Sequence, residues 1–210
     1  MRKWEILLAP YNQAVDELKV KLRGVREQYL KSSKHTPIEF VTGRVKPISS
    51  IIDKASRKNI PLDRLEQELQ DIAGVRIITQ FVEDIETVVE LIRNRKDFEV
   101  VEEINYISEK KPSGYRSYHM ILKYPVQTID GEKNVLVELQ IRTMAMNFWA
   151  TIEHSLRYKY RGEIPQDILM KLQRSSEVAF LLDEEMSIIR EEVREAQQIV
   201  TAKEEQGRKL

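Results

Sequence analysis

Apolar residues recur in alternating steps of four and three at both ends of this chain, and no other feature constrains its fold as much. The N-terminal series is Trp4, Leu8, Tyr11, Val15, Leu18, Leu22, Val25 and Tyr29. The C-terminal series is Ile168, Leu172, Ser175, Ala179, Leu182, Met186, Ile189, Val193, Ala196 and Val200. Such spacing places every member on one stripe of a helix. The sequence therefore predicts a long helix over residues 4–30 and another that starts near residue 165.

Each stripe can pack either on the protein's own core or on a second subunit. For the N-terminal helix both interpretations remain open, since an ordinary amphipathic helix also covers a core. A narrow seam on a long terminal helix suits a partner helix better than a broad domain surface. We therefore expect the C-terminal helix to make contacts between subunits of a homo-oligomer.

Composition excludes several classes of protein. The 34 basic and 34 acidic side chains cancel, so no overall field attracts nucleic acid or an anionic membrane. The absence of cysteine excludes disulfides, cysteine-bound zinc and a thiol nucleophile. The N-terminal apolar run is too short for a signal peptide, and no later run has the length of a membrane span. We expect a cytoplasmic protein.

Residues 37–160 carry mixed patterns. Helices are predicted at 46–59, 83–95 and 145–160, the first of them after a turn at Thr42–Gly43. Strands are predicted at 75–82, 98–107, 117–124 and 134–143, with a hairpin turn at Asp130–Gly131. Interleaved helices and strands indicate an α+β fold with a mixed sheet covered by helices. The chain thus divides into segments 1–36, 37–160 and 161–210.

The strand at residues 135–142 is the most informative one for function. Side chains alternate across a strand, so Glu138, Gln140 and Arg142 project together from one face. On a half-exposed strand, such a face is usually the solvated one. This polar face would indicate a functional site only if other polar groups lay beside it.

Asp71 precedes the mostly apolar segment 72–78, so its carboxylate is expected at the mouth of a buried strand. One carboxylate from each of two strands, completed by substrate phosphates, is a common way to hold magnesium. An isolated aspartate is more often a helix cap or a turn residue. Cations that could clamp a triphosphate are Arg44, Lys46, Lys54, Arg57 and Arg76. By charge alone, this group is equally a surface cluster.

The segment 110–119 combines lysines, a glycine and an aromatic side chain. Tyr115 could stack on a flat base, although a lone tyrosine is usually a buried one. His119 is one of 3 histidines in the chain. With no cysteine and no paired histidine spacing, a zinc site is not expected.

These residues belong to strings that resemble the synthetase motifs of RelA/SpoT-type alarmone enzymes. The strings are EFVTGRVKP at 39–47, DIAGVR at 71–76, SGYRSYH at 113–119 and VELQIRT at 137–143, and NFWATIEH at 147–154 continues the match. The resemblance spans most of the chain and is greatest to the small RelQ-type synthetases. It implies a nucleotidyltransferase-like sheet in segment 37–160 and transfer of pyrophosphate from ATP to the 3′-hydroxyl of GDP or GTP.

The resemblance also assigns residues. Asp71 and Glu138 would hold Mg²⁺ on the ATP phosphates, with Glu138 as general base toward the 3′-hydroxyl. Arg44 and Arg76 would sandwich the adenine, while Lys46, Lys54 and Arg57 bind the phosphates. Tyr115 would stack on guanine. The other residues around GDP or GTP would be Lys111, His119, Gln140, Arg142 and Asn147.

Regulation and assembly follow from the same resemblance. RelQ-type enzymes form homotetramers in which the alarmone product binds a central cleft and activates synthesis, and some relatives bind single-stranded RNA. The matching cleft residues are Lys19, Arg23, Arg26, Phe40 and Thr42, with Arg23 at a position where the pattern has lysine. None of His35, His119 and His154 is followed by aspartate, so the hydrolase motif of larger relatives is missing.

Two other functions compete with this one. A regulatory RNA-binding oligomer would use nucleotides only as ligands. A polymerase-like nucleotidyltransferase would transfer a nucleoside monophosphate and release pyrophosphate. Only the synthetase would release AMP.

Overall fold

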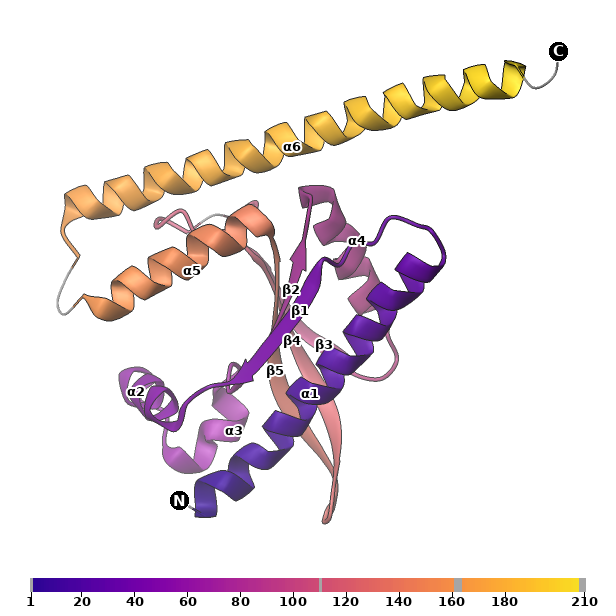
Figure 1. Ribbon diagram of the computed structural model, residues 1–210. Coiled ribbons are helices and arrows are strands. Elements are labelled where there is room, and N and C mark those ends of the chain that lie inside the picture. The colour runs from indigo at the N-terminus through magenta and orange to yellow at the C-terminus, as the bar shows by residue number, and fades with distance from the viewer. Residues whose placement is uncertain (1, 110, 161–163, 208–210) are drawn as a thin grey trace.

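A mixed sheet flanked by helices forms the centre of the molecule (Figure 1), in a computed structural model that describes residues 2–109, 111–160 and 164–207. The strands are β1 Phe40–Val45, β2 Ala73–Thr79, β3 Glu99–Asn105, β4 Tyr118–Thr128 and β5 Gly131–Thr143. They form one 5-stranded sheet in the order β1-β2-β5-β4-β3. Strands β2 and β5 are parallel, and the other neighbouring pairs are antiparallel. The predicted α+β fold with a mixed sheet is confirmed.

Long helices stand at both ends of the chain, as predicted. The helices are α1 Arg2–Lys31, α2 Ile48–Lys58, the short 3-10 helix η1 Leu62–Arg64, α3 Leu65–Glu68, α4 Val82–Arg93, α5 Met144–Lys159 and α6 Gln166–Gly207. Within the parts of the chain that the structure describes, no helix has the apolar length needed to cross a bilayer.

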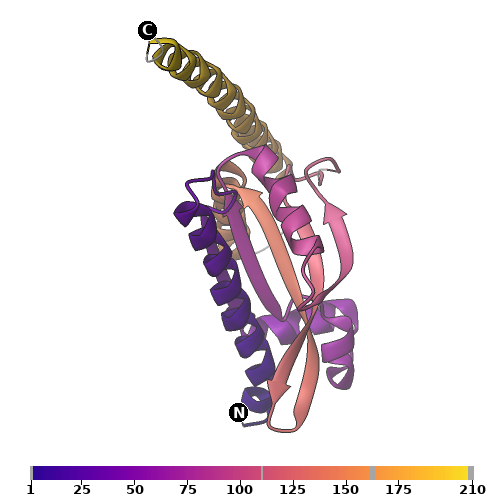
Figure 2. The ribbon, with the colours of Figure 1, turned by 90° about the vertical axis from the view of Figure 1, so that its right-hand side faces the viewer.

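Helices α1 and α4 cover one face of the sheet (Figures 1 and 2). The buried members of the N-terminal stripe, Tyr11, Val15, Leu18 and Leu22, belong to the same apolar cluster as Val75 and the inward-facing residues of the other strands. Burial of this stripe stabilises the fold through the hydrophobic effect. The stripe of α1 therefore packs on the protein's own core, which resolves the question that the sequence left open.

The opposite face of the sheet is polar in its middle and is covered at one end by α5, over which α6 passes (Figure 1). The indole Nε1 of Trp149 in α5 donates to the carbonyl oxygen of Leu172 in α6, at 3.0 Å. Most of the C-terminal stripe does not face the sheet, since Leu182 is 55% exposed and Val193 62%. The rest of the described chain thus leaves more than half of each of these two side chains exposed.

Several boundaries differ from the prediction. Thr42–Gly43 is not a turn but the middle of β1. The glycine is explained by the close approach of α1, since a Cβ at residue 43 would lie 2.8 Å from Val15 Cγ1. Helix α2 starts at Ile48 rather than at residue 46, since Pro47 has an extended backbone with ψ 144°. The short helices at 62–68 were not predicted. The predicted segment boundary at 160/161 touches residues 161–163, which lie outside the described part of the chain.

A buried carboxyl group joins α6 to the end of β5. Asp183 is buried and accepts a hydrogen bond from the Thr143 hydroxyl at 2.7 Å. Burial raises the pKa of Asp183 to about 6, although Thr143 and the charge of Arg116 lower it. A carboxyl whose pKa is higher in the folded state gains stability as the pH falls through that value.

We therefore expect Asp183→Asn to be more stable than the wild type above neutral pH, because the amide avoids a buried charge. The gain in melting temperature should be a few degrees at about pH 8 and should shrink as the pH falls through about 6, where the wild-type carboxyl takes up its proton. Thermal denaturation of both proteins across this range measures the difference. A gain that stays constant with pH would contradict the assignment.

Candidate active site

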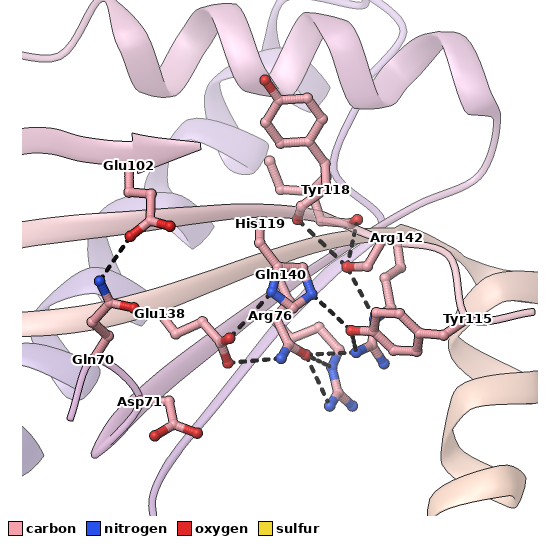
Figure 3. Close-up of polar contacts among 12 residues, drawn as sticks. Gln70, Asp71, Arg76, Glu102, Tyr115, Tyr118, His119, Glu138, Gln140 and Arg142 are labelled. Atoms are coloured by element: carbon pink, nitrogen blue, oxygen red, sulfur yellow. Dashed lines mark hydrogen bonds and ion pairs between the residues drawn. The ribbon is translucent and has the colours of Figure 1, made fainter. Parts of the chain in front are cut away.

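Polar side chains from three neighbouring strands meet on the open face of the sheet (Figure 3). Gln140 of β5 pairs in register with Arg76 of β2 on one side and with His119 of β4 on the other. Glu138 lies two residues before Gln140 in β5, so its side chain is on the same face, and it pairs with Gly74 of β2. Because paired residues point to the same face, these side chains form adjacent rows. The polar face of β5 is thus part of a larger polar site rather than an ordinary solvated face.

Glu138 is held by two neighbours. His119 Nδ1 lies 3.1 Å from its Oε1, and Gln140 Nε2 donates to its Oε2 at 2.8 Å. Burial raises the pKa of Glu138, but the hydrogen bond and charge of His119 outweigh burial and hold the pKa below its ordinary value. Glu138 is therefore an ionised, oriented carboxylate at neutral pH, which is the state that a general base needs.

A hydrogen-bonded chain extends from Glu138 to the loop before β4. The Tyr115 hydroxyl lies 2.7 Å from His119 Nε2, and Arg142 donates to the same hydroxyl. In a neutral His119 with its proton on Nδ1 toward Glu138, Nε2 accepts from the Tyr115 hydroxyl; in the imidazolium both nitrogens donate, and the hydroxyl oxygen accepts from Nε2. The predicted base and the predicted guanine-stacking residue are thus coupled through one imidazole.

Asp71 lies immediately before β2 and is surrounded by cations. Lys46, which follows β1, and Lys54 of α2 both donate to its Oδ2, Lys54 at 2.5 Å. Burial raises the pKa of Asp71, but the two lysines outweigh burial and lower it, while burial lowers the pKa of Lys46. The other oxygen of Asp71, Oδ1, is buried and has no hydrogen-bond partner.

A buried carboxylate oxygen without a hydrogen-bond partner costs folding free energy unless a bound ligand interacts with it. Figure 3 shows Asp71 and Glu138 on the same side of the sheet, and the charge of Asp71 acts on the pKa of Glu138. Among the described residues, no group of three or more acidic, histidine or cysteine side chains could hold a metal alone. The residues fit a Mg²⁺ ion only with phosphate oxygens from a substrate, which is the usual mode for this ion.

Positive charge without a carboxylate partner lies beside this pair. Arg76 donates to Gln140 and, at 3.1 Å, to Asn147 Oδ1 of α5. Arg142 is buried and bonds Ser117, Tyr115 and Gln140. Burial and the charge of Arg142 lower the pKa of Arg76 to about 10. In the described structure neither guanidinium pairs with a carboxylate, so both favour an anionic ligand.

The aromatic group around Tyr115 includes Tyr106, which the sequence patterns did not single out. The rings of Tyr106 and His119 are 5.0 Å apart, and Lys111 Nζ lies 4.2 Å from the Tyr106 ring centre. Tyr106 N donates to Ser117 O at 3.0 Å, which extends the pairing of β3 with β4. Only that pairing, and no local motif, could have placed Tyr106 in the site.

The remaining predicted residues are less tightly gathered. Arg44 is exposed on β1 opposite Gly74, on the face that carries Glu138. Arg57 is exposed on α2, where its Nε donates to the carbonyl oxygen of Asp53 rather than reaching Asp71. The structure thus brings Lys46 and Lys54 to the site and leaves Arg44 and Arg57 at its margin.

The predicted alarmone-binding residues gather at the β1 edge but on two sides of it. Arg23 donates to the carbonyl oxygen of Val41 at 3.3 Å, and Lys19 and Arg26 stand on the same helix, α1. Phe40 and Thr42 are exposed and alternate with buried Val41, so they point away from α1. The described chain alone does not close a pocket around all five.

Comparison with known proteins agrees with this geometry. Residues 43–163 match the family described as "Region found in RelA / SpoT proteins". The chain belongs to the RelA/SpoT family. It is 62% identical to GTP pyrophosphokinase YjbM of Bacillus subtilis over 93% of this chain and 92% of that protein.

Solved structures of RelA/SpoT relatives have the same fold. The small alarmone synthetase 1 of Bacillus subtilis bound to its product pppGpp superimposes with a TM-score of 0.89 at 62% identity, covering 92% of this chain and 99% of that chain. The same synthetase bound to AMPCPP gives a TM-score of 0.82 at 58% identity, covering 93% and 100%.

Proposed function

We propose that this protein is a (p)ppGpp synthetase that transfers pyrophosphate from ATP to the 3′-hydroxyl of GDP or GTP, yielding AMP and ppGpp or pppGpp. The observation that carries the proposal is the ionised Glu138 carboxylate, held by His119 and Gln140 beside Asp71 and unpaired guanidinium groups. The names of the relatives, a GTP pyrophosphokinase and a synthetase crystallised with pppGpp, support the same reaction.

The reaction needs a base and charge stabilisation but no covalent nucleophile. Glu138 takes the proton from the 3′-hydroxyl, whose oxygen forms a bond to the β-phosphorus of ATP. The bond between that phosphorus and the oxygen bridging to the α-phosphate breaks, and AMP leaves with the bridging oxygen. His119 and Gln140 keep the carboxylate aimed at the hydroxyl throughout.

Asp71 and Glu138 are the residues that would hold Mg²⁺, with Asp71 Oδ1 as the free ligand atom. When bound, the ion neutralises charge on the transferring phosphates. Lys46 and Lys54 donate to Asp71 Oδ2. The triphosphate of ATP would be a second anion for these two lysines to bind. Arg57 would join them from α2, and Arg44 and Arg76 would enclose the adenine. The AMPCPP complex of the relative supports an ATP site.

Guanine would stack on Tyr115, with Lys111, His119, Gln140, Arg142 and Asn147 around the nucleotide. The Arg142 guanidinium lies 4.9 Å from the Tyr115 ring centre, and Lys111 Nζ lies 5.2 Å from it. These cations occupy the surface that a flat base would use. Binding of guanine would displace one of them toward the phosphates.

Tyr115→Ala should raise the KM for GDP and GTP by about 5- to 150-fold, because base–aromatic stacking contributes about 1–3 kcal/mol. The KM for ATP should change little, since the lysines beside Asp71 are untouched. Initial rates with each nucleotide varied in turn measure both values. Equal losses for ATP and GDP would contradict the placement of guanine on Tyr115.

Assembly and regulation extend the proposal. The exposed stripe of α6 and the exposed side chains of α5 at Met144, Phe148, Ile152 and Leu156 are surfaces on which copies could associate into a homotetramer. Between such copies, Lys19, Arg23, Arg26, Phe40 and Thr42 would bind (p)ppGpp as an activator. Segment 1–36 would be an N-terminal helical segment, segment 37–160 the synthetase domain and segment 161–210 the helix for oligomer contacts. The protein would be a cytoplasmic enzyme of the stringent response without hydrolase activity.

The deciding experiment incubates the purified protein with magnesium, labelled ATP and either GDP or GTP, and separates the products by anion exchange. AMP formed in step with a guanosine tetra- or pentaphosphate supports the synthetase and ranks the acceptors. Pyrophosphate and an adenylated acceptor would instead indicate a nucleotidyltransferase. If neither forms, even with added pppGpp, the alternative of a nucleotide-responsive protein that binds single-stranded RNA gains the lead.

A further inference from the structure

The loop that carries Tyr115 has little backbone pairing of its own. Gly114 N donates to Lys111 O at 2.8 Å, and the loop has no regular secondary structure from Lys111 to Ser117. Gly114 has a φ of +87°, a left-handed conformation that glycine adopts without strain. The position of Tyr115 must therefore depend on what the loop packs against.

Helix α6 holds the loop on both sides of Tyr115. The Ser176 hydroxyl donates to the carbonyl oxygen of Gly114, the residue before Tyr115. Arg116, the residue after it, donates to Ser176 O at 3.0 Å and to Glu177 Oε2 at 3.0 Å. Ser176 is 3% exposed and Arg116 5%, so the bonds between the loop and Ser176 are shielded from water, whereas Glu177 is partly exposed.

The fit between loop and helix is close. A Cβ added at Gly114 would lie 2.6 Å from Ser176 Cβ, and the Arg116 guanidinium lies 4.2 Å from the ring centre of Phe180. A buried guanidinium with several fixed partners cannot shift without losing them. One turn of α6, from Ser176 to Phe180, thus determines where the backbone on either side of Tyr115 lies.

We infer that Ser176 is a positioning residue for the guanosine nucleotide, acting through Gly114 and Arg116 on Tyr115. The inference rests on the proposed function, because it assumes that guanine stacks on Tyr115. The ATP side of the site is built from β1, α2 and the start of β2, and Figure 1 shows α2 and α3 at the opposite end of the sheet from α6. Loosening the Ser176 contacts therefore affects the acceptor and not the donor.

The test compares Ser176→Ala with the wild type in the pyrophosphate-transfer assay. Loss of a buried hydrogen bond that orders the loop should raise the KM for GDP and GTP about three- to tenfold, with the KM for ATP and kcat changed by less than about twofold. A variant that is merely less stable would lower the active fraction and so reduce kcat for both substrates alike.

Ser175→Ala is the matched control. Ser175 is the neighbouring serine on the same helix, but its Oγ accepts from Trp149 Nε1 of α5 at 2.9 Å and does not bond the loop. It should leave the KM for GDP unchanged. Amide hydrogen exchange at residues 113–117 gives a readout that needs no catalysis: exchange should be faster in Ser176→Ala and unchanged in Ser175→Ala.

The outcomes separate the two proposals. An active wild type with an unchanged KM for GDP in Ser176→Ala overturns the role of Ser176 and leaves the synthetase intact. An inactive wild type overturns the synthetase, and calorimetric titration with GDP then decides on Ser176. Weaker GDP binding by Ser176→Ala than by Ser175→Ala supports the positioning role, whereas equal binding by the two, or none by the wild type, overturns it.

Discussion

Glu138→Gln is expected to reduce kcat for alarmone synthesis by about 100- to 10,000-fold, the range that a general base contributes. The amide keeps the size of the side chain and can still accept from His119 Nδ1, which lies 3.1 Å from the carboxylate. It cannot take a proton from the 3′-hydroxyl. The loss should therefore appear mainly in kcat. Because Glu138 would also hold Mg²⁺, the magnesium concentration for half-maximal rate should rise as well.

Stability should change little in this variant. Because the pKa of Glu138 is lowered in the folded state, the carboxylate contributes stability above the ordinary glutamate range, and this stability is lost as the pH falls through the lowered pKa. Replacing it should cost about 1 kcal/mol at neutral pH, or about 2–4 °C in melting temperature. A larger drop would indicate a misfolded protein rather than a missing base.

Glu99→Gln makes the same chemical change on an exposed residue of β3 in the same sheet. Its activity should equal that of the wild type. For the wild type, the lowered pKa also predicts that Glu138 produces no acid limb in the rate profile above its ordinary pKa of 4.5. If Glu138→Gln kept more than about a tenth of the wild-type kcat, a base contribution of the usual size would be excluded.

The polar face of β5 could be predicted from the sequence because alternation along a strand is a local property. Glu138, Gln140 and Arg142 indeed share one face, and register with β2 and β4 adds Arg76 and His119 to it. Alternation could not reveal those partners. Which strands are neighbours depends on the whole topology, and β2 lies beside β5 although about 60 residues separate them.

Other features were hidden because tertiary contacts override local signals. Thr42–Gly43 has the composition of a turn, yet Gly43 is needed in β1 because α1 passes too close for a Cβ. The helices at 62–68 are too short to show a period. Lys46 and Lys54 were predicted to bind phosphate, but their bonds to Asp71 were not predicted, because they join different segments of the chain that only the fold brings together.

The bonds between Asp71 and its lysines make Asp71→Asn the second informative change. The amide keeps an oxygen for Lys46 or Lys54 but loses the negative charge that Mg²⁺ requires. Loss of a metal ligand removes several kcal/mol of transition-state stabilisation, so we expect activity to fall about 100- to 1,000-fold. The magnesium concentration for half-maximal rate should rise as well.

A purely structural role for Asp71 would give a different result. The pKa of Asp71 is lowered, so its charge stabilises the fold above the ordinary carboxyl range, and Asp71→Asn should lower the melting temperature by a few degrees at neutral pH. The decisive measurement is therefore the reaction rate of the folded variant as a function of magnesium concentration. Asp63→Asn, in the exposed η1 helix nearby, is the control and should titrate like the wild type. If Asp71→Asn loses activity but keeps the wild-type dependence on magnesium, the carboxylate serves only to position Lys46 and Lys54, and the ion must be held elsewhere.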